Sequence, residues 1–267
     1  MNEREKYLFD LQGYIVLENV LSPDELQACN DSINAQMASI QRRSGDHLLS
    51  GGSDTLQGDQ GRGDIGGMLS WPKPHCEIWR ALLVQPRVVD FLREILDDGF
   101  RLDHLYGILM TAGTEGHVLH GGGHAANPTH YYRFRNEQIR CGLTVVSYVL
   151  TDQGPGDGGF ACVPGSHKSN YAAPQALRRL EDDWGCVVQP VARAGSVIIF
   201  TEALTHGTLP WNSANERRAM LYKYSPGAIS YARHYLPGGV EEQLNEFTPA
   251  QRAVLEPPYH PSRPQVE

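Results

Sequence analysis

The sequence lacks several features that would place the protein in a specialised class. Its five cysteines are scattered without a C-x-x-C pair, which argues against a disulfide framework or a structural zinc site and favours a reducing compartment. No stretch approaches the roughly 18–20 apolar residues that a membrane helix needs. The charged segment MNEREKYLFD also lacks the apolar run of a signal peptide. We therefore expect a cytoplasmic protein.

Positive charge is also scarce. The 23 lysines and arginines are outnumbered by 31 aspartates and glutamates, giving a net charge of −8. This balance argues against a surface that coats nucleic acid, although a local basic pocket for an anionic small molecule is compatible with it. The 267 residues are 40% hydrophobic and 20% charged, as in globular proteins with a real core. Because no repeat or linker interrupts the chain, we expect one domain over residues 1–267.

Helical signals concentrate in the first 98 or so residues. After a short strand at 14–20, Ser22 is placed as an N-cap and Glu25 completes a capping box around a proline at the first helical position. We expect this helix to run to about Arg43. Two further helices are predicted in the segments HCEIWRALL (75–83) and PRVVDFLREIL (86–96).

A glycine-rich stretch separates these helices. Residues 44–67 contain eight glycines and few apolar side chains. A loop of this length is usually a lid or a binding segment, and a passive insertion is the alternative. We expect it to cover a pocket together with residues 121–130.

The character of the sequence changes to β from about residue 100 to about residue 230. Short β-branched or aromatic runs are separated there by Gly, Pro, Asn and Asp clusters. These runs are RLDHLYGILM, CGLTVVSYVLTD, GGFACVPGSH, CVVQPVA, GSVIIF and RRAMLYKYSP. The pattern predicts a mainly β fold with flanking helices, a double-stranded β-helix (jelly roll) whose N-terminal helices pack on one sheet.

Two histidines and an arginine stand out within this β region. His120 opens the glycine-rich stretch HGGGHAANPTH after a predicted strand, and His206 directly follows the strand GSVIIF. Arg217 lies eleven residues further on, at the start of the next strand. In a jelly roll this spacing places both imidazoles at one open mouth, with the arginine pointing inward from the adjacent strand.

Four motifs give the chain its resemblance to a known family. The segments GYIVLENVLSPDEL, GDGGFACVPGSHKS, AGSVIIF and THGTLPW…ERRAMLYKYSP resemble the phytanoyl-CoA dioxygenase family of iron(II)/2-oxoglutarate oxygenases. The resemblance implies non-haem iron held by His120 and His206. It also implies 2-oxoglutarate held at its far carboxylate by Arg217, whose planar, permanently charged guanidinium suits bidentate binding. Thr208 is a further candidate for binding this co-substrate, with Thr144 and Tyr132 as weaker ones.

The chain departs from the family at one ligand position. The family motif is H-x-D, whereas this sequence has Gly122 in place of the aspartate. An H-x-G motif resembles the iron/2-oxoglutarate halogenases, in which chloride takes the carboxylate's position, and we expect chlorination of an unactivated carbon in natural-product (antibiotic) biosynthesis. Two alternatives stay open: a hydroxylase or other oxidant with water at that position, and a jelly-roll binding module without catalysis.

A further alternative to chloride at this position is a carboxylate from elsewhere in the chain. The nearest candidates by sequence lack the tight spacing that would orient them beside His120; they are Asp103, Asp152, Asp157 and Glu202. We expect Asp157 to stabilise a turn, and His167 either to stabilise a turn or to support a metal ligand rather than to bind the metal itself. The remaining nearby histidines are expected not to ligate the metal, although any of them would be able to line the pocket; they are His117, His124 and His130.

The stretch HYYRFRNEQIR at 130–140 gives the main indication of a substrate. Its aromatic and cationic residues suit an anionic, ring-bearing molecule, with an adenine nucleotide as the favoured example; a solvated strand edge is the alternative. The predicted substrate residues are Arg133, Arg135, His130 and Lys168, with Lys223 as a further anion partner. Beyond iron, 2-oxoglutarate, dioxygen, chloride and this small molecule, the sequence indicates no partner.

Overall fold

The computed structural model describes residues 1–122 and 127–266. Its helices are α1 (Glu3–Gln12), α2 (Pro23–Ala35), α3 (Glu77–Leu82), α4 (Pro86–Leu96), α5 (Gln175–Arg178) and α6 (Pro249–Val254). Its strands are β1 (Tyr14–Leu17), β2 (Gln41–Arg42), β3 (Gly63–Ile65), β4 (Arg101–Met110), β5 (His117–His120), β6 (Tyr132–Arg135), β7 (Gln138–Cys141), β8 (Thr144–Val149), β9 (Gly159–Cys162), β10 (Val197–Thr201), β11 (His206–Leu209) and β12 (Arg217–Ser225).

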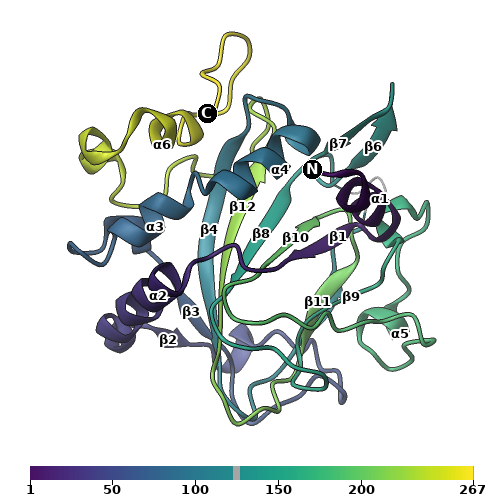
Figure 1. The fold of residues 1–267 in the computed structure, drawn as a ribbon. Coiled ribbons are helices and arrows are strands. Elements are labelled where there is room, and N and C mark those ends of the chain that lie inside the picture. The colour runs from purple at the N-terminus through teal and green to yellow at the C-terminus, as the bar shows by residue number, and fades with distance from the viewer. Residues whose placement is uncertain (123–126, 267) are drawn as a thin grey trace.

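The strands form two antiparallel layers and a separate hairpin. A seven-stranded sheet has the order β1-β10-β8-β12-β4-β3-β2, and a three-stranded sheet has the order β5-β11-β9. Strands β6 and β7 pair only with each other. Helices α3 and α4 cover one face of the large sheet, and the small sheet lies on its other side (Figure 1). The predicted jelly roll with flanking helices is therefore confirmed, as two sheets that do not close into a barrel.

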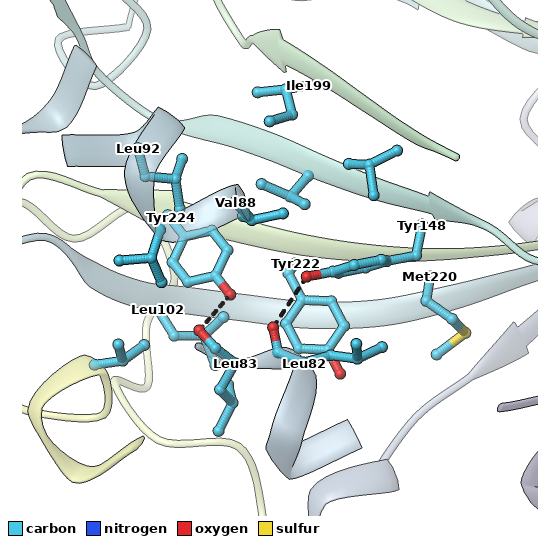
Figure 2. Close-up of a cluster of buried hydrophobic side chains, with 14 of the residues drawn as sticks. Leu82, Leu83, Val88, Leu92, Leu102, Tyr148, Ile199, Met220, Tyr222 and Tyr224 are labelled. Atoms are coloured by element: carbon cyan, nitrogen blue, oxygen red, sulfur yellow. Dashed lines mark hydrogen bonds between the residues drawn. The ribbon is translucent and has the colours of Figure 1, made fainter. Parts of the chain in front are cut away.

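The face of the large sheet that meets the helices is held by tyrosines. The hydroxyl groups of Tyr148, Tyr222 and Tyr224 donate to backbone carbonyls of the segment around α3, at Leu82, Trp79 and Leu83 respectively. Figure 2 shows these rings packed among aliphatic side chains of the sheet and of α4. All three tyrosines are fully buried, so each buried hydroxyl is paired, as the cost of an unpaired one requires.

The first long helix begins as predicted and ends earlier. Ser22 accepts from the Glu25 amide and the Glu25 side chain accepts from the Ser22 amide, which confirms the capping box. The expectation that this helix reaches Arg43 is wrong, because α2 ends at Ala35 and a 3-10 turn follows it. Strand β2 then pairs with β3, so an edge-strand pairing replaces the last helical turns.

Two other expectations about secondary structure need correction. The segment CVVQPVA makes only isolated bridges, at Val188 and Ala192, because Pro190 between them has no backbone N–H to donate. Helices α1 and α6 and the β6–β7 hairpin were not predicted, although capping boxes at Asn2–Glu5 and Thr248–Gln251 mark the starts of the two helices. Residues 44–67 are irregular as predicted, except for a 3-10 turn at Gly45–His47 and strand β3. Within the described chain, no helix is both long and apolar enough to cross a membrane.

Candidate metal and co-substrate site

His120 and His206 lie opposite each other on paired strands. His120 ends β5, His206 begins β11, and the two residues are register partners in the three-stranded sheet. Their ring centroids are 4.3 Å apart. Antiparallel pairing therefore closes the sequence separation between them and brings the two imidazoles together, as predicted; the sheets form no closed barrel mouth around them.

Both rings are oriented by the backbone. The Nδ1 of His120 lies 3.0 Å from the Val118 carbonyl, and the Nδ1 of His206 lies 2.8 Å from the Leu204 carbonyl. Since a carbonyl oxygen can only accept, each Nδ1 donates, and each Nε2 keeps its lone pair. A histidine that donates from one nitrogen to a backbone carbonyl and offers the other is the usual arrangement of a metal ligand.

Burial keeps these rings neutral. Desolvation, followed by the neighbouring ring of His120, lowers the pKa of His206 to about 3. Desolvation also lowers the pKa of His120. Because the neutral imidazole is the form that binds a metal ion, the environment favours the ligating form.

An internal cavity extends from these histidines to Arg217. Its lining combines the two rings with aromatic, aliphatic and cationic side chains: Arg62, Tyr106, Ile108, His117, His120, Ser147, Phe160, Phe200, His206, Gly207, Thr208, Arg217, Leu221 and Lys223. Arg217 is 5% exposed, and burial, with Arg62 nearby, lowers its pKa to about 10. Its guanidinium stays charged at neutral pH, and it donates from Nε to Gln153 Oε1 over 3.2 Å. The donor set fits a divalent metal beside a small dicarboxylate.

Lys223, which lines the same cavity, forms a buried ion pair with Glu202, which is not itself in the lining. Glu202 is 2% exposed, and its Oε1 accepts from Lys223 Nζ at 2.6 Å. Its other oxygen, Oε2, lies 3.8 Å from His206 Nε2. Burial alone raises the pKa of the Glu202 carboxyl, but the charge of Lys223 and its hydrogen bond outweigh this effect and hold the pKa below its usual range. Glu202 is therefore an anion within reach of the histidines.

The backbone at Gly122 has a conformation that explains its identity. Gly122 has a φ of 106°, a region that residues with a side chain rarely adopt. Its amide donates to the Glu202 carbonyl at 3.2 Å. The segment that would carry the aspartate of H-x-D thus packs against the loop after β10, in a form that disfavours any side chain at position 122.

The predicted co-substrate residues divide into two groups. Thr208 lies on β11 and lines the cavity with Arg217. Thr144 does not line it, and its hydroxyl donates to the Gly142 carbonyl at 3.1 Å. Tyr132 also lies outside the lining and donates to Asp10. Only Thr208 among the three is placed beside the histidines.

Most of the predicted substrate residues lie away from this cavity. Arg133 and Arg135 are exposed on β6, and the Arg133 guanidinium stacks 4.8 Å from the Tyr131 ring centroid. Lys168 forms an ion pair with Asp10 at 2.9 Å. None of these three cations is in the cavity lining. The two arginines lie on a hairpin that is separate from both sheets, and Lys168 lies in a 3-10 turn.

His130 is the exception among them. Its ring stacks on that of Tyr231, with centroids 5.4 Å apart. Glu202, Lys223 and His120 all act on its pKa, which burial lowers below the ordinary value. His130 therefore lies on the approach to the histidine site, although it is not in the cavity lining itself.

The remaining expected residues take structural or lining positions. Asp157 Oδ2 accepts from the Gly154 amide in a turn, and His167 Nε2 donates to the Asp10 carbonyl, so both stabilise turns or loops as predicted. His117 lines the cavity, with its ring 4.4 Å from that of His120. His124 lies outside the described residues. Arg62 also lines the cavity, near Arg217. Its place in a glycine-rich loop of the sequence did not predict this position.

The structure distinguishes the four candidate carboxylates. Asp103 is bound to Arg101 and His104, and Asp152 caps the Ala194 amide. Asp157 is engaged in its turn, which leaves Glu202 as the candidate beside the histidines. As they lie, no three His, Cys, Asp or Glu side chains within residues 1–122 and 127–266 form a complete metal site.

Fold and site together define a class of protein: a jelly roll with two inward histidines that can hold a metal ion and a buried arginine that can hold an anion. A family model described as Phytanoyl-CoA dioxygenase (PhyH) matches residues 9–219. The chain belongs to this family. Among curated protein sequences, none matches the chain.

Solved structures share the fold at low identity. HygX from Streptomyces hygroscopicus, with nickel and 2-oxoglutarate bound, has a TM-score of 0.70 and 19% identity, covering 87% of this chain and 90% of its own. The carbocyclase SnoK from nogalamycin biosynthesis, described as non-heme and alpha ketoglutarate dependent, has a TM-score of 0.61 and 18% identity over 98% of this chain and 94% of its own. The epimerase SnoN from the same biosynthesis has a TM-score of 0.60 and 16% identity, covering 85% of this chain and 83% of its own.

Proposed function

We propose that the protein is an iron(II)/2-oxoglutarate-dependent oxygenase that oxidises a small organic molecule. The observation that carries this proposal is the placement of His120 and His206 as facing partners in one cavity with Arg217. The two Nε2 atoms hold the iron, and the Arg217 guanidinium holds the far carboxylate of 2-oxoglutarate. Thr208 adds a hydroxyl to that end of the cavity. Bound iron supplies the oxidising chemistry, with dioxygen as oxidant and 2-oxoglutarate as reductant.

The rest of the cavity supports this chemistry by excluding water. Phe160 and Phe200 pack at centroid distances of 6.2 and 4.7 Å from the His206 ring. Such apolar walls protect a reactive centre and strengthen the charge interactions inside it. We propose that residues 1–267 act as one catalytic domain, because β1 near the N-terminus pairs with β10 of the β core. We also retain the cytoplasmic location that the unpaired cysteines predict.

Chlorination is a second candidate, and one observation favours it. Gly122 provides no carboxylate, which is the condition under which chloride would occupy an iron position. The buried Glu202 carboxylate argues in the other direction, because its Oε2 lies 3.8 Å from His206 Nε2 and like charges repel strongly at short range in a buried site. We therefore place oxidation without halide ahead of chlorination.

We propose an anionic, ring-bearing substrate that enters through a neighbouring groove. This groove has a volume of about 1020 Å³ and shares Arg62, Tyr106 and Lys223 with the histidine cavity. Its other charged and aromatic lining residues are Arg42, Arg43, His47, Asp64, Trp71, His104 and Tyr231. An adenine nucleotide belongs to this class of molecule. The named biosynthetic neighbours support a role in natural-product biosynthesis.

The test is an aerobic incubation of the purified protein with iron(II), 2-oxoglutarate and a panel of anionic metabolites, with and without chloride. We expect succinate to form and a product to gain oxygen or lose hydrogen, regardless of chloride. A product with the chlorine isotope pattern would instead establish the second candidate. Absence of binding to both iron and 2-oxoglutarate would establish a binding module without this catalysis.

A further inference from the structure

We propose that Glu202 supplies the carboxylate ligand that Gly122 does not provide, so that iron is held by His120, His206 and Glu202. The inference rests on the proposed iron-dependent function and adds a third protein ligand to it. The carboxylate would come from the loop after β10, four residues before His206, rather than from the position two residues after His120.

The distance from Glu202 to His206 is compatible with shared ligation. Nitrogen and oxygen ligands lie about 2.1 Å from a divalent metal such as zinc, so two of them on one ion are at most about 4.2 Å apart. Glu202 Oε2 and His206 Nε2 are separated by 3.8 Å. Two ligand atoms at right angles around the metal would be about 3.0 Å apart. Shared ligation at this angle therefore needs Glu202 Oε2 to move less than about 1 Å closer to His206 Nε2. As they lie in residues 1–122 and 127–266, these side chains do not yet form a complete three-residue site, so the inference requires this movement.

The backbone places Glu202 where the carboxylate is missing. The Gly122 amide donates to the Glu202 carbonyl at 3.2 Å, so residues 122 and 202 are direct neighbours. A Cβ at Gly121 would come within 2.7 Å of the same carbonyl. The close packing at Gly121 and the positive φ of Gly122 both disfavour side chains in this segment, whereas the Glu202 carboxylate lies beside His206.

Lys223 orients the carboxylate. Its Nζ donates to Oε1 at 2.6 Å, while the other oxygen is the one nearest His206. A buried ion pair could be purely structural. A purely structural pair would need only Oε1 of Glu202. Here the second oxygen, Oε2, also lies beside Nε2 of His206, although the Leu204 carbonyl already fixes the orientation of that ring.

The experiment measures metal affinity, without turnover. Cobalt(II) and anaerobic iron(II) are titrated into the metal-free protein by calorimetry. The variant Glu202→Leu/Lys223→Met removes both charges, because replacing a buried pair by apolar residues of similar size often preserves folding. Loss of a group that only orients a metal ligand typically lowers the metal affinity by about 10-fold or more. We expect the loss of the ligand itself to lower the affinity by at least about 10-fold. Equal affinity in this variant would overturn the inference.

Two controls separate the ligand role from the loss of charge. Lys223→Met retains the carboxylate and should bind cobalt(II) more tightly than the double variant. Asp103→Asn alters another buried carboxylate, paired with Arg101 at 3.2 Å outside the cavity lining, and should leave the affinity unchanged. Weakening in Asp103→Asn equal to that in the double variant would overturn the inference.

The absorption bands of bound cobalt(II) give a second readout. At saturating cobalt, they should change in the double variant because a ligand atom is replaced, and stay unchanged in Asp103→Asn. Unchanged bands in the double variant would show an effect through charge alone and overturn the inference. Failure of the unmodified protein to bind either metal would overturn the proposed function itself, and this inference with it.

Discussion

Alternate residues of β12 face two different environments. Met220, Tyr222 and Tyr224 belong to the core cluster beneath the helices, and Figure 2 shows them packed there. Leu221 and Lys223 line the cavity on the other face. The tyrosine hydroxyls on the helix face are paired with backbone carbonyls. The cavity face instead buries charged groups around internal space.

This difference indicates a division of tasks within one sheet. Apolar packing and paired hydroxyls fix the sheet against α3 and α4, and the fixed sheet then holds cavity residues at set positions. Substitutions on the helix face should therefore lower stability, whereas substitutions on the cavity side should lower ligand binding or turnover. The predictions below test this separation.

The largest effect is expected for His206→Ala. Loss of a group that only supports a metal ligand lowers activity by up to about 100-fold. Loss of a histidine ligand itself should therefore reduce succinate formation by at least about 100-fold. Cooperative urea unfolding should persist, because this ring lies on β11 of the small sheet, on the other side of the large sheet from α3 and α4 (Figure 1). Succinate formation within a few fold of the unmodified protein would contradict the assigned metal position.

On the helix face, Met220→Ala should cost about 2–5 kcal/mol of the free energy of unfolding, because Met220 is fully buried and the change leaves a cavity. Leu221→Ala, one residue further on, enlarges a cavity that already exists and should cost less. Urea denaturation measures both. An equal or larger loss for Leu221→Ala would contradict the separation of the two faces.

Arg217→Met should raise the KM for 2-oxoglutarate by about 10–150-fold, which corresponds to a hydrogen bond to a charged group of about 1.5–3 kcal/mol. Arg218→Met is the matched control. The Arg218 guanidinium bonds Glu216, Asn30 and Asn34 rather than lining the cavity. Steady-state kinetics should show an unchanged KM for the control. A raised KM in Arg218→Met alone would assign the co-substrate to the other arginine.

Tyr222→Phe should lower the free energy of unfolding by about 1–3 kcal/mol, because the Trp79 carbonyl loses its buried donor. The KM for 2-oxoglutarate should not change. Tyr171→Phe, on a side chain that is 86% exposed, should leave both quantities as they were. A stability loss in Tyr171→Phe of the same size would show that burial is not the cause.

The last prediction concerns His167, which lies outside both faces. Burial lowers its pKa from 6.5 to about 4, so between these values the unfolded chain binds a proton that the folded chain does not. His167 therefore lowers the stability as the pH drops from 6.5 toward 4, and its own contribution is about 2 kcal/mol between pH 7 and pH 5. Urea unfolding at both pH values should show a smaller drop for His167→Gln. An unchanged drop would exclude His167 as the source.

The sequence was sufficient to predict features that depend on interactions between residues close together in the chain. The capping box at Ser22 and Glu25 depends on residues three apart and was predicted correctly. The continuation of that helix to Arg43 was not, because strand pairing at the sheet edge decided its end. The substrate prediction for Arg133 and Arg135 failed to place them at the cavity for a similar reason: their charge is visible in the sequence, but the direction of a hairpin is not.

The sequence by itself determined the jelly roll, the family and the histidine–histidine–arginine pattern, because strand periodicity and ligand spacing are written along the chain. Only the tertiary structure decided which carboxylate lies at the site. Pairing of β5 with β11 brings residues 121–122 against residue 202. Gly122, which lacks the expected carboxylate, adopts a left-handed backbone there. It lies beside buried Glu202, which sequence spacing could not distinguish from three aspartates.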